Sequence, residues 1–194
     1  MKNIEQELKL QLTEREYNVL HALGDGLDVE QVNYYFYYDN MPLKTMVRIR
    51  KKQGVYTLCY KDSLSQRNSV SVCRELECEI TEGLAKSFME KGISQQQLMT
   101  MLNISMPEPL RCIGNLTTIR KVINIGGMKV ELDRNSYLGV TDYELECECD
   151  NVEQLETLKN YLQFNYGITL KPSCAKSKRF AERLAGIPMM LGER

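Results

Sequence analysis

The sequence contains no tryptophan, a single histidine and no long apolar run. The histidine, His21, stands in a helical pattern, so we do not expect histidine-based catalysis. No stretch approaches the roughly 20 apolar residues of a membrane span. Glu5 and Glu7 also stand where a secretory signal needs apolar residues. We therefore predict a cytoplasmic protein without a membrane partner.

An excess of either charge is also missing. Lysine and arginine number 25 against 26 aspartates and glutamates, which gives a net charge of −1. No global basic field is present to attract nucleic acid, so we expect no nucleic-acid partner. The 194 residues are 43% hydrophobic and 26% charged, which is typical of a soluble globular protein and excludes collagen-like and disordered chains.

The seven cysteines lack the arrangement of a disulfide framework or a zinc site. Their number is odd, no C-x-x-C spacing occurs, and Cys78, Cys147 and Cys149 alternate with acids. We interpret them as reduced thiols that act as small hydrophobic residues.

Turn signals divide the remaining sequence into many short segments, most of them extended. Helical periodicity is present in four places, at residues 13–23, 82–102, 152–164 and 176–184. Thr13 and Glu16 form a capping box for the first helix, and Asn151 is a candidate cap for the third. Strands are expected at 4–12, 32–38, 45–52, 55–61, 70–80, 110–113, 116–124, 128–133 and 143–149.

Two short segments recur at a nearly constant distance. Ile49-Arg50-Lys51 returns as Ile119-Arg120-Lys121, and the sequence ELECE of residues 75–79 returns at 144–148, with offsets of 70 and 69. A duplicated β-unit explains the common offset better than coincidence does. We predict one domain over residues 1–194, built from two quasi-repeated halves at about 1–105 and 106–194.

Charged residues gather on one face of most predicted strands. Strand alternation places Glu5, Glu7 and Lys9 on one side of the first strand, and Arg48 with Arg50 on one side of another. The same alternation aligns acids in further strands, at Glu75, Glu77 and Glu79, at Glu131 and Asp133, and at Glu144, Glu146 and Glu148.

Two arrangements are compatible with these faces. They belong to an ordinary sheet whose charged side faces water, or they line the inside of a closed sheet. Segregation of acids from arginines favours the second, because like charges two positions apart repel unless neighbouring strands or bound ions compensate them. Such a lining suits a chain of phosphates, since arginines grip phosphate and clustered carboxylates hold Mg²⁺ or Mn²⁺ that bridges to it.

The ordered set of charged residues resembles the CYTH superfamily, the triphosphate tunnel metalloenzymes. Glu5-x-Glu7-x-Lys9 matches the E-x-E-x-K signature of that family. The later matches follow in family order and span almost the whole chain: the 35–39 segment YFYYD, Arg48-Ile49-Arg50, Lys61, the acids of 75–79, Arg120, Leu132-Asp133 and Glu144-x-Glu146. A lysine near the C-terminus is also expected, and of Lys176 and Lys178 we prefer Lys178.

The resemblance implies an α+β fold that is mainly antiparallel β, with an eight-stranded closed β-tunnel, a charged lumen and helices packed on the outside. It implies divalent metal ligands at Glu5, Glu7, Asp133, Glu144 and Glu146. It implies a triphosphate grip made by Lys9, Arg48, Arg50, Lys61, Arg120 and Lys176 or Lys178, with Glu75 and Glu77 in support. The extra acids Glu79 and Glu148 leave the register of the functional acids open.

We accordingly expect a Mg²⁺- or Mn²⁺-dependent hydrolase, a monomer or homodimer, that acts on inorganic triphosphate or a small organic triphosphate such as thiamine triphosphate. The catalytic candidates are Glu146, Lys9 and Arg50, with either Glu146 or a metal-bound hydroxide as the base. Two alternatives stay open: a class IV-like adenylate cyclase and a non-catalytic module that binds polyphosphate or nucleotide. The full set of acids disfavours the binding module, which needs only the cations.

Overall fold

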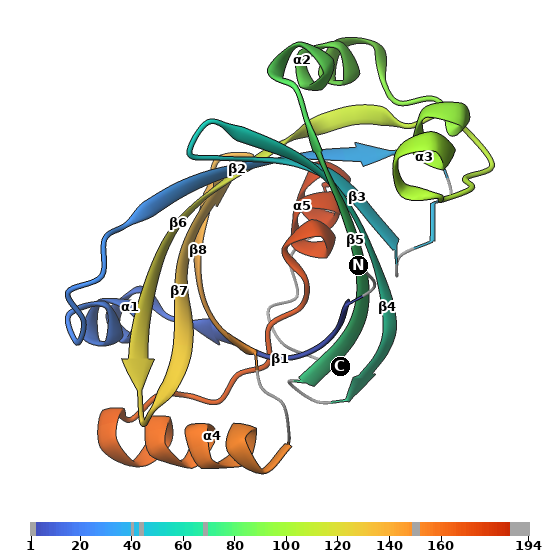
Figure 1. Cartoon of the computed structure of the whole chain (residues 1–194). Helices are drawn as coiled ribbons and strands as arrows, with labels where there is room; N and C mark the ends of the chain where they lie inside the picture. The colour runs from blue at the N-terminus through green and yellow to red at the C-terminus, as the bar shows by residue number, and fades with distance from the viewer. Residues whose placement is uncertain (1–2, 40, 43–44, 68–69, 149–151, 187–194) are drawn as a thin grey trace.

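The structure is a computed structural model that describes residues 3–39, 41–42, 45–67, 70–148 and 152–186, and the side chains of these residues except at 3–6, 63–67, 70–72 and 152. Eight strands form one antiparallel sheet (Figure 1): β1 (Asn3–Leu12), β2 (Val29–Tyr37), β3 (Thr45–Lys52), β4 (Val55–Arg67), β5 (Val70–Ile80), β6 (Arg111–Ile125), β7 (Met128–Tyr137) and β8 (Val140–Glu148). The helices are α1 (Glu14–His21), α2 (Glu82–Lys91), α3 (Gln95–Leu102), α4 (Val152–Tyr166) and α5 (Lys176–Leu184). The predicted α+β class with an eight-stranded antiparallel sheet is confirmed.

The strand order brings the first and the last strand of the sheet together. The order is β1-β5-β4-β3-β2-β6-β7-β8, and β1 pairs with both β5 and β8, so the strands form a closed barrel. Glu7 lies opposite Ser71 of β5 on one side and Glu148 of β8 on the other. Because every strand has two neighbours, each has one face toward the inside of the barrel and one toward the outside.

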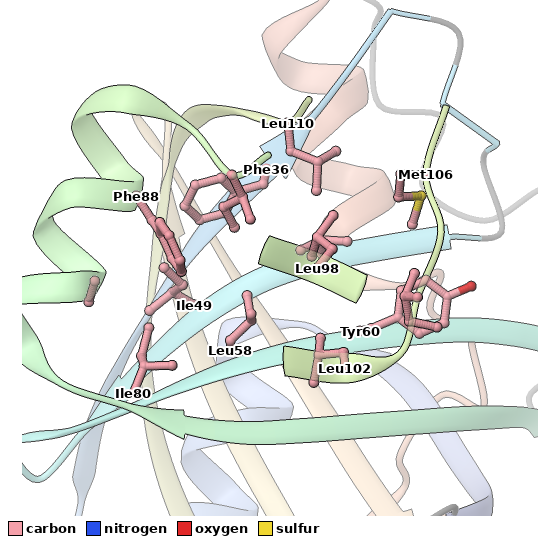
Figure 2. Close-up of a cluster of buried hydrophobic side chains, with 14 of the residues drawn as sticks. Phe36, Ile49, Leu58, Tyr60, Ile80, Phe88, Leu98, Leu102, Met106 and Leu110 are labelled. Atoms are coloured by element: carbon pink, nitrogen blue, oxygen red, sulfur yellow. The ribbon is translucent and has the colours of Figure 1, made fainter. Parts of the chain in front are cut away.

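The outward faces are apolar, and four helices cover them. Leu98 and Leu102 of α3 and Phe88 of α2 pack with Ile49 and Leu58 of the strands (Figure 2). On the other side, the α1 and α4 helices cover β1, β6, β7 and β8 through a second apolar cluster: Tyr17, Leu20, Leu155, Leu158 and Leu162 of the helices against Leu8, Leu10, Leu132 and Leu145 of the strands. The main apolar packing therefore lies outside the barrel, and the inward faces are left for polar side chains.

Helix α5 does not follow the predicted placement of helices on the outside. Its Phe180 is fully buried and packs with Tyr35, Leu116 and Tyr137, whose strands bear the charged inward face. Gly114, at φ 135°, permits this contact, because a Cβ at that position would lie 2.9 Å from Phe180 Cζ. The same glycine lies within β6, so the two predicted strands at 110–113 and 116–124 are one strand with a register shift.

Two further predicted boundaries were wrong. The helix expected at 82–102 is two helices, because Gly92 at φ 84° ends α2 and a side chain there would meet the Leu110 carbonyl. Ser94 then caps α3 in a capping box with Gln97. The turn signal at residues 134–136 lies inside β7, where the Asn135 side chain is buried and bonds with those of Thr118 and Asp142.

One local prediction is confirmed. Thr13 and Glu16 form the predicted capping box of α1. The cysteines at 59, 73, 78, 112, 147 and 174 form no disulfide, while Asn151 and Cys149 lie outside the described residues. Among the helices of the described segments, none has the combination of length and apolar character that a bilayer crossing requires.

Candidate functional site

The charged residues predicted from strand alternation meet on the inside of the barrel. Each strand contributes alternate residues, so acids and bases far apart in the sequence become neighbours through strand pairing. Asp133 of β7 lies opposite both Arg120 of β6 and Glu144 of β8, and Glu146 lies opposite Lys9 of β1. The described side chains brought together in this way are Glu7, Lys9, Arg48, Arg50, Lys61, Glu75, Arg120, Asp133, Glu144 and Glu146.

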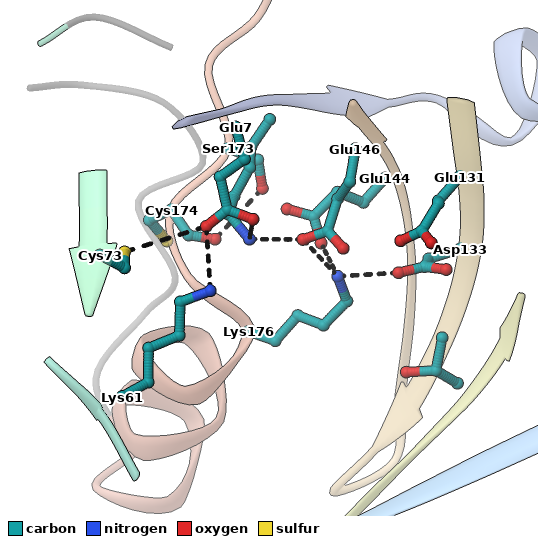
Figure 3. A network of polar contacts seen from close by, with 12 residues as sticks. Glu7, Lys61, Cys73, Glu131, Asp133, Glu144, Glu146, Ser173, Cys174 and Lys176 are labelled. Carbon is teal, nitrogen blue, oxygen red and sulfur yellow. Dashed lines mark hydrogen bonds and ion pairs between the residues drawn. The ribbon is translucent and has the colours of Figure 1, made fainter. Parts of the chain in front are cut away.

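Three carboxylates from adjacent strands form the most buried part of the site. One oxygen from each of Asp133, Glu144 and Glu146 lies within 4.8 Å of the others. Lys176, the first residue of α5, extends its ammonium among them, with Nζ at 2.9 Å from Asp133, 2.6 Å from Glu144 and 2.9 Å from Glu146 (Figure 3). We call these three acidic residues the acid triad.

A second group of charges adjoins the acid triad. Lys9 Nζ lies 2.5 Å from Glu146 and 3.1 Å from Glu7, and so connects the triad to Glu7. Lys61 Nζ lies 3.3 Å from the other oxygen of Glu7 and 3.5 Å from Glu75. Acids and bases therefore alternate across the interior, which offsets the repulsion that like charges would otherwise cause.

Two arginines of β3 approach the site from the opposite wall. Arg48 Nη2 lies 3.2 Å from Glu75, and Arg50 lies 3.8 Å from Glu75 and 3.7 Å from Glu77. The Nε–H groups of both arginines are buried, and neither has a hydrogen-bond partner among the described residues. A buried donor without a partner costs free energy, so each arginine retains capacity to bind an acceptor.

Arg120 binds the acid triad from β6. Its Nε and Nη2 donate to both oxygens of Asp133 at 2.7 and 2.6 Å, which is the paired geometry that arginine makes with carboxylates. Nη2 also lies 2.6 Å from Glu146, and Nη1 bonds with Glu131. Glu131 is thus part of this network, although the sequence reasoning did not assign it a role.

The surrounding cations control the protonation of the acids. Burial would raise the pKa of Glu144, but Arg179 and Lys176 beside it lower that pKa to about 2. Burial likewise opposes ionisation of Glu146, yet Lys176, Lys9 and Arg120 hold its pKa well below the usual range. Both groups are therefore carboxylates at neutral pH and suited to bind cations.

These shifts predict an acid-sensitive fold. Glu144 has a lower pKa folded than the usual value of 4.5, so it stabilises the fold above that value and the stabilisation is lost as the pH falls toward about 2. This difference in pKa corresponds to a contribution from Glu144 of about 3 kcal/mol to the free energy of unfolding at neutral pH. We expect the free energy of unfolding, measured by urea titration between pH 6 and 2.5, to fall steeply below pH 4.5.

A matched variant tests the assignment of this slope. Glu144→Gln removes the titrating group, so its stability should depend less on pH over the same range. Glu153→Gln, an exposed position on α4, should keep the wild-type slope. Identical slopes in the wild type and Glu144→Gln would contradict the lowered pKa.

One cation of this site, Arg179, was not predicted from the sequence. Arg179 of α5 is 2% exposed and binds Asp142 through Nε at 3.0 Å and Glu144 through Nη2 at 3.1 Å. The signal was present, because residues three apart on a helix share a face and the 176–179 spacing pairs Arg179 with Lys176. Asp142 also continues the alternation of Glu144 and Glu146 along β8.

The preference for Lys178 is corrected by the structure. Lys178 is half exposed and its Nζ lies 3.8 Å from Glu182 of its own helix, whereas Lys176 is buried in the acid triad. Residues two apart on a helix point about 200° apart, so only one of these lysines can face inward. The side chain of Glu5 lies outside those that the structure describes.

The acid triad fits a hard divalent cation. Three buried carboxylates supply the oxygen ligands that Mg²⁺ and Mn²⁺ prefer. Cys59, Glu75 and Glu77 also present ligand atoms within 4.8 Å of one another, but one of these three ligands is a thiol. Burial raises the pKa of the Cys59 thiol to about 12, so the thiolate that a metal requires is disfavoured there.

The chain is similar to known proteins in sequence and in fold. The sequence model of the family described as the CYTH domain matches residues 3–181, while a comparison with curated protein sequences finds no match. A solved structure from Bacillus halodurans, described as a candidate adenylate cyclase, is 27% identical, with a TM-score of 0.73 over 92% of this chain and 98% of that chain. Another, from Hippeastrum, is described as a candidate adenylyl cyclase with a dominant triphosphatase activity, and it shares the fold at 24% identity and a TM-score of 0.76 over 98% of this chain and 100% of that chain.

Proposed function

The chain belongs to the CYTH domain family, and from this membership we propose that it is a divalent-metal-dependent phosphohydrolase that acts on triphosphate-containing substrates. Inorganic triphosphate and a small organic triphosphate such as thiamine triphosphate are the substrates that we propose. The Hippeastrum relative, for which a dominant triphosphatase activity is described, supports the choice of hydrolysis.

The observation that carries the proposal is that the interior of the barrel holds both a cluster of buried carboxylates and arginines that can still bind an acceptor. The acid triad lies on β7 and β8, while Arg48 and Arg50 lie on β3 across the barrel, each with a buried Nε–H that has no partner among the described residues. A triphosphate carries enough negative charge to occupy several cations at once, and a divalent cation lets carboxylates share the same ligand. An ordinary water-facing sheet needs neither feature.

The roles follow from these positions. We assign Asp133, Glu144 and Glu146 as the residues that would hold Mg²⁺ or Mn²⁺, with Glu7 and Glu5 as further candidate ligands. When bound, such a cation neutralises charge on the phosphate oxygens. Arg48, Arg50, Lys61, Lys9, Arg120 and Lys176 would grip and orient the phosphate chain, which is the main demand of phosphoryl transfer. The lowered pKa of Glu146 favours cation binding over a role as general base, because such a carboxylate holds a proton weakly.

An adenylate cyclase is the second candidate, because the Bacillus halodurans relative is described as a candidate adenylate cyclase. The two reactions give different products from ATP. The decisive experiment incubates the purified chain with inorganic triphosphate, thiamine triphosphate or ATP, each with Mg²⁺ or Mn²⁺, and resolves the products. Release of orthophosphate supports the hydrolase, cyclic AMP with pyrophosphate supports the cyclase, and binding without turnover would leave only the binding module.

Arg50→Ala is expected to weaken substrate capture. The variant loses a charged hydrogen-bond donor facing the interior, which costs on the order of 1.5–3 kcal/mol and lowers kcat/KM for inorganic triphosphate by about 10- to 100-fold. The control is Lys51→Ala, because Lys51 is the next residue on β3 and points outward over the Tyr56 ring at 5.5 Å. A kcat/KM for Arg50→Ala within about twofold of that for Lys51→Ala would remove Arg50 from the grip.

A further inference from the structure

The ammonium of Lys176 lies where the acid triad would hold a cation. Its Nζ lies between 2.6 and 2.9 Å from an oxygen of each of the three carboxylates (Figure 3). These are the same three residues whose oxygens lie close enough to share one metal ion. A single positive charge from α5 therefore neutralises the triad in this structure.

We propose that Lys176 is a resident counter-ion that competes with the divalent cation for the acid triad and is released toward the phosphate chain when that cation binds. The inference rests on the proposed function, since it assumes that the triad takes a divalent cation. It adds that binding of the metal and of the triphosphate are coupled through one side chain.

Lys176 differs from the other cations around the triad in its choice of partners. Arg120 also binds Glu131, Lys9 also binds Glu7, and Arg179 also binds Asp142. Within the described part of the chain, Lys176 makes ion pairs with the triad carboxylates alone. If the triad binds a metal ion, each of the other three cations therefore keeps an acid partner, whereas Lys176 becomes available for an anion.

The position of Lys176 allows its side chain to move. It is the first residue of α5. The helix is held one turn further on, where Arg179 and Phe180 are buried. Lysine has a flexible four-carbon stem with a compact charge, so the ammonium can leave the triad while α5 and the barrel strands stay in place.

Competition of this kind has two consequences of opposite sign. Without the ammonium, the triad keeps its negative charge and should bind a divalent cation more tightly. Without the same ammonium, the phosphate chain loses a partner and should bind more weakly. If Lys176 merely supported the structure, its replacement would weaken the binding of the divalent cation and of the phosphate chain alike.

The test measures metal binding in the absence of any phosphate. Isothermal titration calorimetry with MnCl₂ compares the full wild-type chain with Lys176→Met and with Lys178→Met, the control that removes an exposed lysine from the same helix. We expect Lys176→Met to bind Mn²⁺ about tenfold more tightly than the wild type, because it removes a like charge from the triad. Lys178→Met should bind as the wild type does. At saturating Mn²⁺, the KM of Lys176→Met for inorganic triphosphate should rise by about tenfold.

Each outcome separates the inference from the proposed function. Equal or weaker Mn²⁺ affinity of folded Lys176→Met, with clear binding to the wild type, overturns the competition and leaves the metal site standing. Absence of Mn²⁺ binding to both folded proteins overturns the metal site and the competition together. If Lys176→Met does not fold, Lys176→Gln supplies the same comparison, because the amide keeps hydrogen-bond donors for the acids without the charge.

Discussion

Glu146→Gln is expected to lower metal-dependent release of phosphate strongly. Glu146 contacts Lys9, Arg120 and Lys176 and belongs to the acid triad. The amide keeps the size of the side chain but removes the charge that would bind a divalent cation. We expect kcat to fall at least about a hundredfold, the scale on which loss of one charge-stabilising group acts in enzymes.

The dissociation constant of inorganic triphosphate in the absence of divalent cations gives a second readout. Removing one negative charge makes the interior more positive, so without metal the triphosphate should bind at least as well to the variant as to the wild type. Glu153→Gln on α4, whose side chain is exposed, is the control and should keep the wild-type kcat and dissociation constant. Wild-type turnover by a folded Glu146→Gln protein would exclude Glu146 from the metal site and from the chemistry.

Arg179→Met is expected to cause a large loss of stability. The guanidinium is 2% exposed, pairs with Asp142 and Glu144, and donates to Ser173 Oγ at 2.6 Å and the Cys174 carbonyl at 2.5 Å. Its removal leaves the buried Asp142 without an ion pair among the described residues and leaves Glu144 with Lys176, and breaking a buried ion pair costs about 3–5 kcal/mol. In a domain of this size, each kcal/mol shifts the melting temperature by about 2–4 °C, so a decrease of roughly 6–20 °C is expected.

Arg111→Met is the matched control for this prediction. Arg111 also pairs with an aspartate, Asp39, but its side chain is 73% exposed, and exposed pairs contribute little. The melting temperature of that variant should therefore stay close to the wild-type value. Adding Asp142→Asn to Arg179→Met should recover part of the lost stability, because it removes the buried charge whose ion pair with Arg179 is lost. Equal melting temperatures for Arg179→Met and Arg111→Met would show that Arg179 does not secure α5.

Local sequence patterns are sufficient to identify most of the charged interior. Alternation with a period of two places Lys9, Arg48, Arg50, Glu144 and Glu146 on charged strand faces. This works because the direction of a side chain on a strand depends only on its own backbone. The capping box of α1 is local in the same sense. The duplication of two halves stays a prediction, although Arg50 and Arg120, which occupy equivalent places in the repeat, both face inward.

The tertiary structure decided which charges meet and which helical residues join them. Alternation does not reveal that β1 pairs with β8. Lys9 and Glu146 are 137 residues apart in the sequence, and that strand pairing brings them together. Lys176 and Lys178 are chemically identical, and the packing of α5 against the strands, with Phe180 buried beside Gly114, is what turns Lys176 and Arg179 toward the acids. Such docking depends on the shape and packing of residues distant in sequence, whereas helix periodicity fixes only which residues share a face. The sequence therefore predicts most of the charged strand residues that face the interior, but long-range strand pairing and the packing of one helix determine the partner of each charge.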